Sequence, residues 1–132
     1  MSDIETKWLD RYVAPQAPFM CLCLTEEEYL HVLRQLKAKT SEPWVMNDQS
    51  QASVHYLTDG DGDLTCVVCL RDWQKYSGVE IAGVLVHEAV HIWQEYADNI
   101  GERHPGREQE AYAIQHIAQT LMAEFARRVE AA

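Results

Sequence analysis

The sequence from Ser77 to Val129 predicts two long helices, which constrain the fold more than any other feature. The first helix runs from Ser77 or Gly78 to about Asp98 and begins with the apolar run Ile81–Val86. A helix that is apolar on every side is expected to be central and buried. The second helix runs from about Arg107 to Val129. Its apolar stripe recurs at helical spacing and consists of Ile114, Ile117, Leu121 and Phe125.

The N-terminal part predicts shorter elements. We expect a helical turn around Trp8 and a strand over Phe19–Leu24, which is short and apolar. Thr25 and Glu28 have the spacing of a capping box, so a helix begins at Thr25 and runs to about Lys39. Residues 40–51 carry Ser, Pro, Asn and Asp and are expected to form a loop.

Two β-rich segments, Val54–Leu57 and Leu64–Leu70, flank the turn signal Asp59–Asp63 and predict a β-hairpin. The three aspartates of this turn also resemble the start of a calcium-binding EF-hand loop. However, Leu64 and Leu70 stand where that loop needs glycine and glutamate, so a solvated turn is favoured. The order of elements predicts an α+β fold.

Composition limits the classes of partner. A chain of 132 residues corresponds to a single domain, residues 1–132. Its net charge of −10 opposes binding to nucleic acid and to anionic membranes. It has no apolar run of transmembrane length and no secretory signal at its start, which favours a cytoplasmic protein. The sequence does not indicate an oligomeric state.

The four cysteines are Cys21, Cys23, Cys66 and Cys69. Residues two apart in a strand share a face, whereas residues three apart do not. Cys66 and Cys69 are therefore expected on opposite faces, which disfavours a four-thiolate metal site and a disulfide. Buried reduced thiols are the preferred interpretation.

The sequence His87-Glu88-Ala89-Val90-His91 is an H-E-x-x-H motif within the first long helix. With 6 histidines in the chain, roughly 0.03 such motifs are expected by chance. Histidines four residues apart lie on one helical face and can converge on one ion. Burying these polar groups in an apolar helix without partners would be costly, which favours a bound metal ion over a fortuitous exposed face.

A catalytic zinc ion usually takes a third protein ligand. The metzincin pattern is excluded, because positions 94 and 97 are Gln94 and Ala97 rather than glycine and histidine. Glu110 continues the apolar stripe of the last helix, whereas Glu108 lies about 200° away on that helix. Glu110 is therefore the predicted third ligand.

The motif followed by Glu110 resembles the gluzincin branch of zinc metallopeptidases over about residues 64–120. It is most similar to minimal single-domain members, many of them bacterial or phage-encoded. The resemblance implies a zincin-like core of short sheet or hairpin, active-site helix and C-terminal glutamate-bearing helix. It also implies Zn²⁺ held by His87, His91 and Glu110, with Leu64–Leu70 as the sheet edge that pairs with substrate.

The activity that the resemblance implies is hydrolysis of a peptide or protein amide bond by a zinc-bound water, with Glu88 as general base. Tyr112, His116, His104 and His55 are the candidates to stabilise the developing oxyanion, and Tyr112 lies nearest to Glu110 in sequence. The aspartate that gluzincins often carry four residues after the third ligand is Ile114 here.

Two alternatives remain open. The chain could be a zinc-stabilised binding or assembly protein that does not cleave. It could also be a zinc hydrolase acting on a non-peptide amide such as a cell-wall fragment. Glu88 favours an enzyme, because a purely structural site has no use for that carboxylate.

Overall fold

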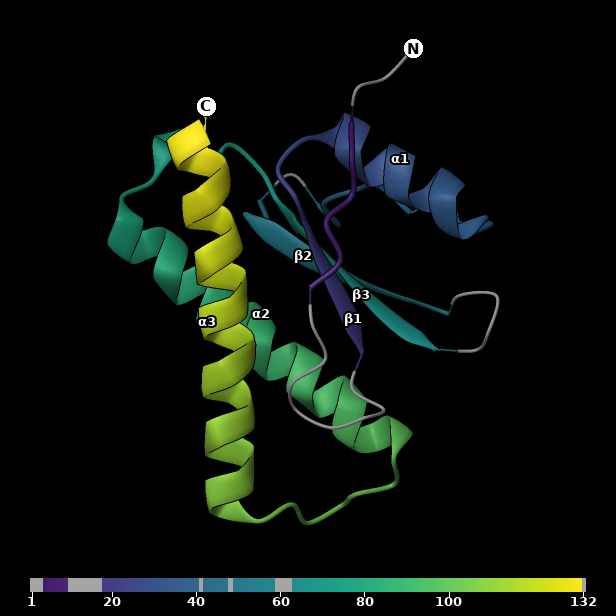
Figure 1. Cartoon of the computed structure of the whole chain (residues 1–132), viewed down its shortest axis with the longest axis vertical. Coiled ribbons are helices and arrows are strands. Elements are labelled where there is room, and N and C mark those ends of the chain that lie inside the picture. Colours follow the sequence, from purple (N-terminus) through teal and green to yellow (C-terminus); the bar gives the residue numbers. More distant parts are fainter. Residues whose placement is uncertain (1–3, 10–17, 41, 48, 59–62, 132) are drawn as a thin grey trace.

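The computed structural model describes residues 4–9, 18–40, 42–47, 49–58 and 63–131 (Figure 1). The elements are β1 (Phe19–Cys23), α1 (Glu26–Leu36), β2 (Ala52–Thr58), β3 (Leu64–Leu70), a 3-10 turn (Trp73–Lys75), α2 (Gly78–Asn99) and α3 (Arg107–Ala131). The predicted α+β class is confirmed. The two strands of the predicted hairpin pair as expected. Residues 59–62 of the turn between them lie outside the described residues, and so does the calcium-binding alternative.

The sheet has the strand order β1-β3-β2. β1 runs parallel to β3, and β2 runs antiparallel to it. The expectation that Leu64–Leu70 forms a sheet edge is therefore wrong, because β3 is hydrogen-bonded on both sides. A strand in that position is also covered on both faces, which explains why its residues from Cys66 to Leu70 are fully buried.

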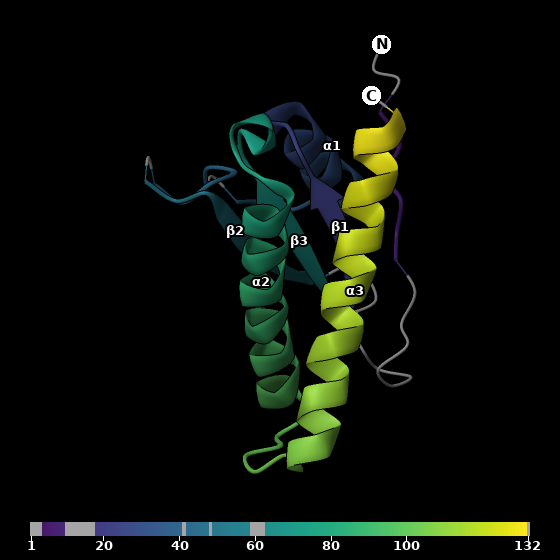
Figure 2. The ribbon, with the colours of Figure 1, turned by 90° about the vertical axis from the view of Figure 1, so that its left-hand side faces the viewer.

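Helices cover both faces of the sheet (Figures 1 and 2). α2 and α3 lie side by side on one face, and α1 lies on the other. Alternate strand residues contact the two layers, so that Val68 packs with α2 and α3 whereas Val67 packs with α1. Among the described helices, none has the length and apolar character that crossing a membrane requires.

Local capping explains where the helices begin and end. Ser77 and Glu80 form a complete capping box at the start of α2. At α1 the Thr25 hydroxyl accepts from the Glu28 N–H, but the Glu28 carboxylate accepts from the N–H of Leu24. α1 ends earlier than predicted, because Lys37 takes a left-handed conformation with φ of 55°.

α2 is buried on one side only, which corrects the expectation of a helix buried all round. Gly83 and Val86 of its apolar run are exposed. The buried positions recur every three or four residues and face the sheet and α3. They are Ile81, Leu85, Glu88, Ala89, Ile92, Trp93, Tyr96 and Ala97.

The predicted helical turn around Trp8 is also wrong. Residues 4–8 form no helix, and Leu9 instead forms an antiparallel bridge with Met20 on β1. The Leu9 N–H donates to the Met20 carbonyl at 3.0 Å. Leu9 is buried in the core between the sheet and α2 and α3, so tertiary packing overrides the local sequence preference.

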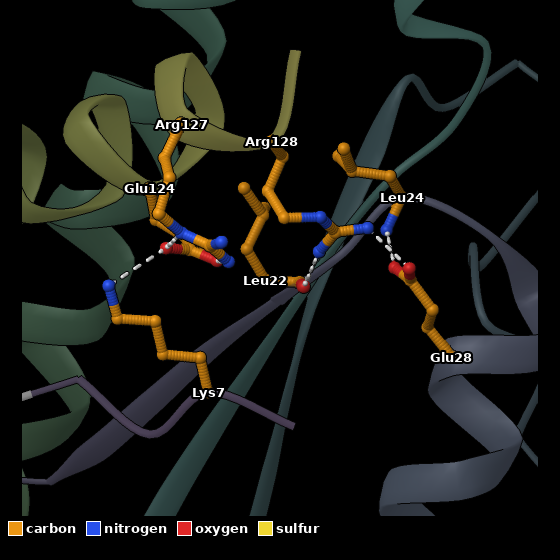
Figure 3. Close-up of polar contacts among 7 residues, drawn as sticks. All are labelled: Lys7, Leu22, Leu24, Glu28, Glu124, Arg127 and Arg128. Atoms are coloured by element: carbon orange, nitrogen blue, oxygen red, sulfur yellow. Dashed lines mark hydrogen bonds and ion pairs between the residues drawn. The ribbon is translucent and has the colours of Figure 1, made fainter. Parts of the chain in front are cut away.

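The C-terminal part of α3 is tied to the N-terminal half by charged contacts (Figure 3). The Arg127 guanidinium donates two hydrogen bonds to the Glu124 carboxylate, at 2.8 and 2.6 Å. Lys7 lies 3.6 Å from the same carboxylate. Arg128 donates to the Leu22 carbonyl and pairs with the Glu28 carboxylate.

Glu124 is expected to make folding stability depend on acid pH. Burial raises the pKa of Glu124. The hydrogen bonds and charge of Arg127, together with the charges of Lys7 and Arg128, lower this pKa by more, so the net shift is downward. A lowered pKa contributes stability above the unfolded-state value, about 4.3, and this stability is lost as pH falls through the folded-state value. Chemical unfolding at pH 7 should show that Glu124→Gln lowers the free energy of unfolding by about 1 kcal/mol. The loss is no larger because Arg127 and Lys7 are half exposed and solvent screens their charges.

The difference between wild type and Glu124→Gln should shrink when unfolding is repeated below about pH 4. Glu130→Gln, an exposed position on the same helix, is the control and should show a smaller loss. An equal loss for Glu124→Gln at both pH values would contradict the role given to this carboxylate.

Candidate metal centre

His87 and His91 converge on the exposed side of α2. Their Nε2 atoms are 3.2 Å apart, and their rings meet edge to face with centroids 4.8 Å apart. Both side chains are exposed, so the expectation that they are buried in an apolar helix is wrong. The predicted convergence of the two imidazoles is confirmed, since their one-turn spacing puts them on one face.

Gln94 orients the second histidine. Its side-chain oxygen lies 3.2 Å from Nδ1 of His91. An amide oxygen only accepts hydrogen bonds, so Nδ1 carries the proton and Nε2 of His91 keeps its lone pair. Metal-ligating histidines generally have such a partner on the second ring nitrogen. Gln94 thus supplies a hydrogen-bond partner for the second ring nitrogen of His91.

Glu88 lies about 100° around the helix axis from His87 and about 60° from His91. Its side chain is 6% exposed, in contrast to the two histidines. Burial raises the pKa of Glu88, while the charges of His87 and His91 lower it, and the net shift is upward. A carboxylate whose pKa is raised is a stronger base than an ordinary glutamate.

Glu110 lies on the core-facing side of α3, as predicted, but it meets a different side of α2. The indole Nε1–H of Trp93 donates to Oε2 of Glu110 at 2.7 Å. Trp93 follows His91 by two residues, which is about 200° around a helix. The structure therefore does not bring Glu110 to the histidine pair. Glu108 is exposed on α3, as predicted.

The histidine pair fits two ligands of a zinc ion. At Zn–N distances of about 2.0–2.1 Å, two tetrahedral ligands lie roughly 3.3 Å apart. The observed separation is 3.2 Å, which is also the length of a hydrogen bond between the two Nε2 atoms. Within the described ranges, no three His, Cys, Asp or Glu side chains are grouped closely enough to hold an ion. Among the described side chains, the structure thus groups only the two histidines, and both the zinc site and the assignment of Glu110 as its third ligand stay predictions.

The four candidates for stabilising an oxyanion occupy different places. Tyr112 is 67% exposed on α3, His104 is exposed in the connection before it, and His116 is half-buried on α3. His55 lies on the α1 face of the sheet, where its ring nitrogens contact Glu42 and the Trp44 carbonyl. The sheet separates His55 from α2, so His55 does not serve this site.

Tyr56, the residue next to His55, was not among the candidates that the sequence indicated. Tyr56 shares a strand face with Ala52 and Val54, which pack against the core of α2 and α3. Burial raises the pKa of Tyr56, and the charges of Cys66, Glu95 and Glu88 raise it further, which places its hydroxyl in the field of the motif glutamate. Strand alternation could have shown that Tyr56 and His55 point to opposite faces, but only the packing shows which face meets α2.

No known protein family, no curated protein and no solved structure matches this chain.

Proposed function

We propose that the chain is a zinc-dependent metallopeptidase that hydrolyses a peptide or protein amide bond. The observation that carries the proposal is the paired geometry of His87 and His91, with Nε2 atoms 3.2 Å apart and Gln94 fixing one tautomer. The order of sheet, histidine-bearing α2 and glutamate-bearing α3 is the order that the gluzincin resemblance implies. Calorimetric titration of zinc into chelator-treated protein tests the site directly, with one equivalent expected to bind.

His87 and His91 would hold the zinc ion, which would supply Lewis acidity toward a water molecule and a carbonyl group. The Glu88 carboxylate then takes the proton from the attacking water and returns it to the leaving amine. Glu88 follows His87 directly on α2, so its carboxylate starts from the same helical turn as both histidines. Tyr56, which is 37% exposed, joins Tyr112, which is 67% exposed, as a candidate to donate a hydrogen bond near Glu88.

The substrate of this proposal is an extended peptide. β2, which carries Tyr56, is an edge strand of the sheet. Within the described residues it pairs only with β3. An outer strand presents unpaired N–H and C=O groups that can hydrogen-bond an added strand. The binding edge expected at Leu64–Leu70 is accordingly reassigned to Ala52–Thr58.

Glu110→Ala is expected to weaken zinc binding by about 10- to 100-fold if Glu110 completes the site by exchanging its Trp93 hydrogen bond for the ion. Zinc affinity is measured by competition with a chromophoric chelator. Glu108→Ala is the matched control, because it removes an equal charge from the exposed side of the same helical turn.

Trp93→Phe separates the two roles of Glu110, because it removes only the indole donor. It should destabilise the fold without weakening zinc binding. Equal zinc affinity in wild type and Glu110→Ala would show that Glu110 only anchors Trp93.

The second candidate function is a zinc-stabilised binding or assembly protein without catalysis. The hydrogen bond between Trp93 and Glu110 favours it, because it keeps the predicted third ligand on the other side of α2. This candidate predicts zinc binding and no cleavage of any peptide.

A further inference from the structure

Three of the four cysteine side chains gather on the α1 face of the sheet. Cys21 and Cys23 come from β1 and Cys69 from β3, and they pack in one cluster. Cys66 lies on the opposite face, in the core of α2 and α3, as strand alternation predicted. All four are free thiols. The cluster is therefore a distinct feature, separated by the sheet from the histidine pair.

Cys23 is the central thiol of the cluster. It is the register partner of Cys69 across the parallel β1–β3 pair, and its sulfur is hydrogen-bonded by the Cys21 and Cys69 thiols. These hydrogen bonds, with the charge of Arg128, lower the pKa of Cys23, whereas burial and Glu28 oppose the shift. The pKa values of Cys21 and Cys69 are raised, so Cys23 is the thiol that ionises first.

A cavity of about 320 Å³ adjoins β1 beside this cluster, although Cys23 is only 1% exposed and Cys69 is fully buried. It lies between residues 4–7, β1, α1 and the C-terminal part of α3, and both Cys21 and Cys23 line it. Its wall carries the cations Lys7, Arg127 and Arg128 and the carboxylates that they pair with (Figure 3). Because a water molecule occupies about 30 Å³ in the liquid, the cavity has room for a small peroxide.

We propose that Cys23 and Cys69 form a peroxide-sensitive thiol pair, with Cys23 attacked through this cavity and Cys69 as its disulfide partner. The Cys23 thiolate attacks one oxygen of a hydroperoxide, the O–O bond breaks, and the other oxygen leaves with a proton as an alcohol or water. Cys23 is then a sulfenic acid. The Cys69 thiol attacks this sulfur, forms the S–S bond and releases water. Two thiols lose two electrons, and the peroxide gains them.

The backbone geometry favours Cys69 over Cys21 as the partner. Neighbouring strands lie about 4.8 Å apart, within the Cα separation of about 4.4–6.8 Å that disulfides span. Cys21 lies two residues away on the same strand, a rise of roughly 6.6 Å, at the far limit of that range. The Arg128 guanidinium donates to the carbonyl of Leu22, next to Cys23, and so keeps a positive charge beside the reacting thiolate.

The test treats the reduced full-length protein with graded hydrogen peroxide, quenches with N-ethylmaleimide and locates each modification by mass spectrometry. We expect a mass decrease of about 2 Da and a linked peptide pair containing Cys23 and Cys69. Cys66→Ser is the matched control, because Cys66 lies on the same strand as Cys69 but faces the core of α2 and α3, away from the cavity. It should oxidise at the wild-type rate, whereas Cys23→Ser should react at least about tenfold more slowly.

The wild-type protein alone decides the outcome if Cys23→Ser does not fold. The proposal is overturned if Cys66 is oxidised as fast as Cys23, or if no thiol reacts until denaturant is added. A Cys21–Cys23 link, or oxidation of Cys23 to sulfinic acid without a disulfide, overturns the assignment of Cys69.

Discussion

Glu88→Gln is expected to lower peptide hydrolysis by about 10²- to 10⁴-fold, the usual contribution of general acid–base catalysis. Glutamine keeps the shape of glutamate but cannot accept the proton of the attacking water. Because Glu88 is 6% exposed and burial raises its pKa, the neutral amide should fit without loss of folding stability. Release of peptides from fluorescein-labelled casein and from a mixed peptide library measures the effect on zinc-loaded protein.

The control for this experiment is Glu95→Gln, a half-exposed glutamate two turns further along α2, which should retain wild-type activity. Zinc content and the thermal midpoint of unfolding should be the same in Glu88→Gln as in wild type. Activity that survives in Glu88→Gln would eliminate the proposed base. A zinc-loaded wild type that cleaves nothing in the library would favour the non-catalytic alternative.

His87→Ala is expected to abolish stoichiometric zinc binding. Protein purified without chelator or affinity metal should contain about one zinc per chain by mass spectrometry, and the variant should contain almost none. The reason is geometric: the two Nε2 atoms lie 3.2 Å apart, and removing one leaves a lone exposed imidazole. Added zinc should raise the thermal midpoint of wild type but not of the variant, since only a ligand that binds the folded state stabilises it.

His104→Ala provides the matched control, because His104 is an exposed histidine outside the pair, and it should keep its zinc. His87 is also exposed, so its loss should cost little folding stability in the absence of metal. Metal-free wild type whose stability does not change with zinc would mean that the two imidazoles only contact each other. The functional proposal would then fail, whereas the proposed reactivity of Cys23 would be unaffected.

The helices and strands could be predicted because their signals are local. The apolar run from Ile81 and the apolar spacing on the last helix predicted α2 and α3 to within about two residues. The hairpin strands followed from two β-rich segments around a turn signal. The helical turn near Trp8 could not be judged in the same way, because Leu9 is held by a backbone pairing with Met20, a contact that no local propensity encodes.

The candidate site was predicted in part. Helical spacing alone places His87, His91 and Gln94 on one face. The wheel also placed Glu110 on the inner side of its helix correctly. It could not show which side of α2 that carboxylate meets, because a wheel refers each residue only to the axis of its own helix. Packing decided that Glu110 meets Trp93.

The sequence by itself determined the α+β class, the histidine pair and the separation of Cys66 from Cys69, since each depends on the repeat of one helix or strand. The tertiary structure alone decided that β3 is the central strand, that α2 exposes its histidines, and that Arg128 lies beside Cys23. These depend on which surfaces meet between segments up to about a hundred residues apart. Strand order and helix docking follow from burial of the whole apolar surface, a property that no short window of sequence carries.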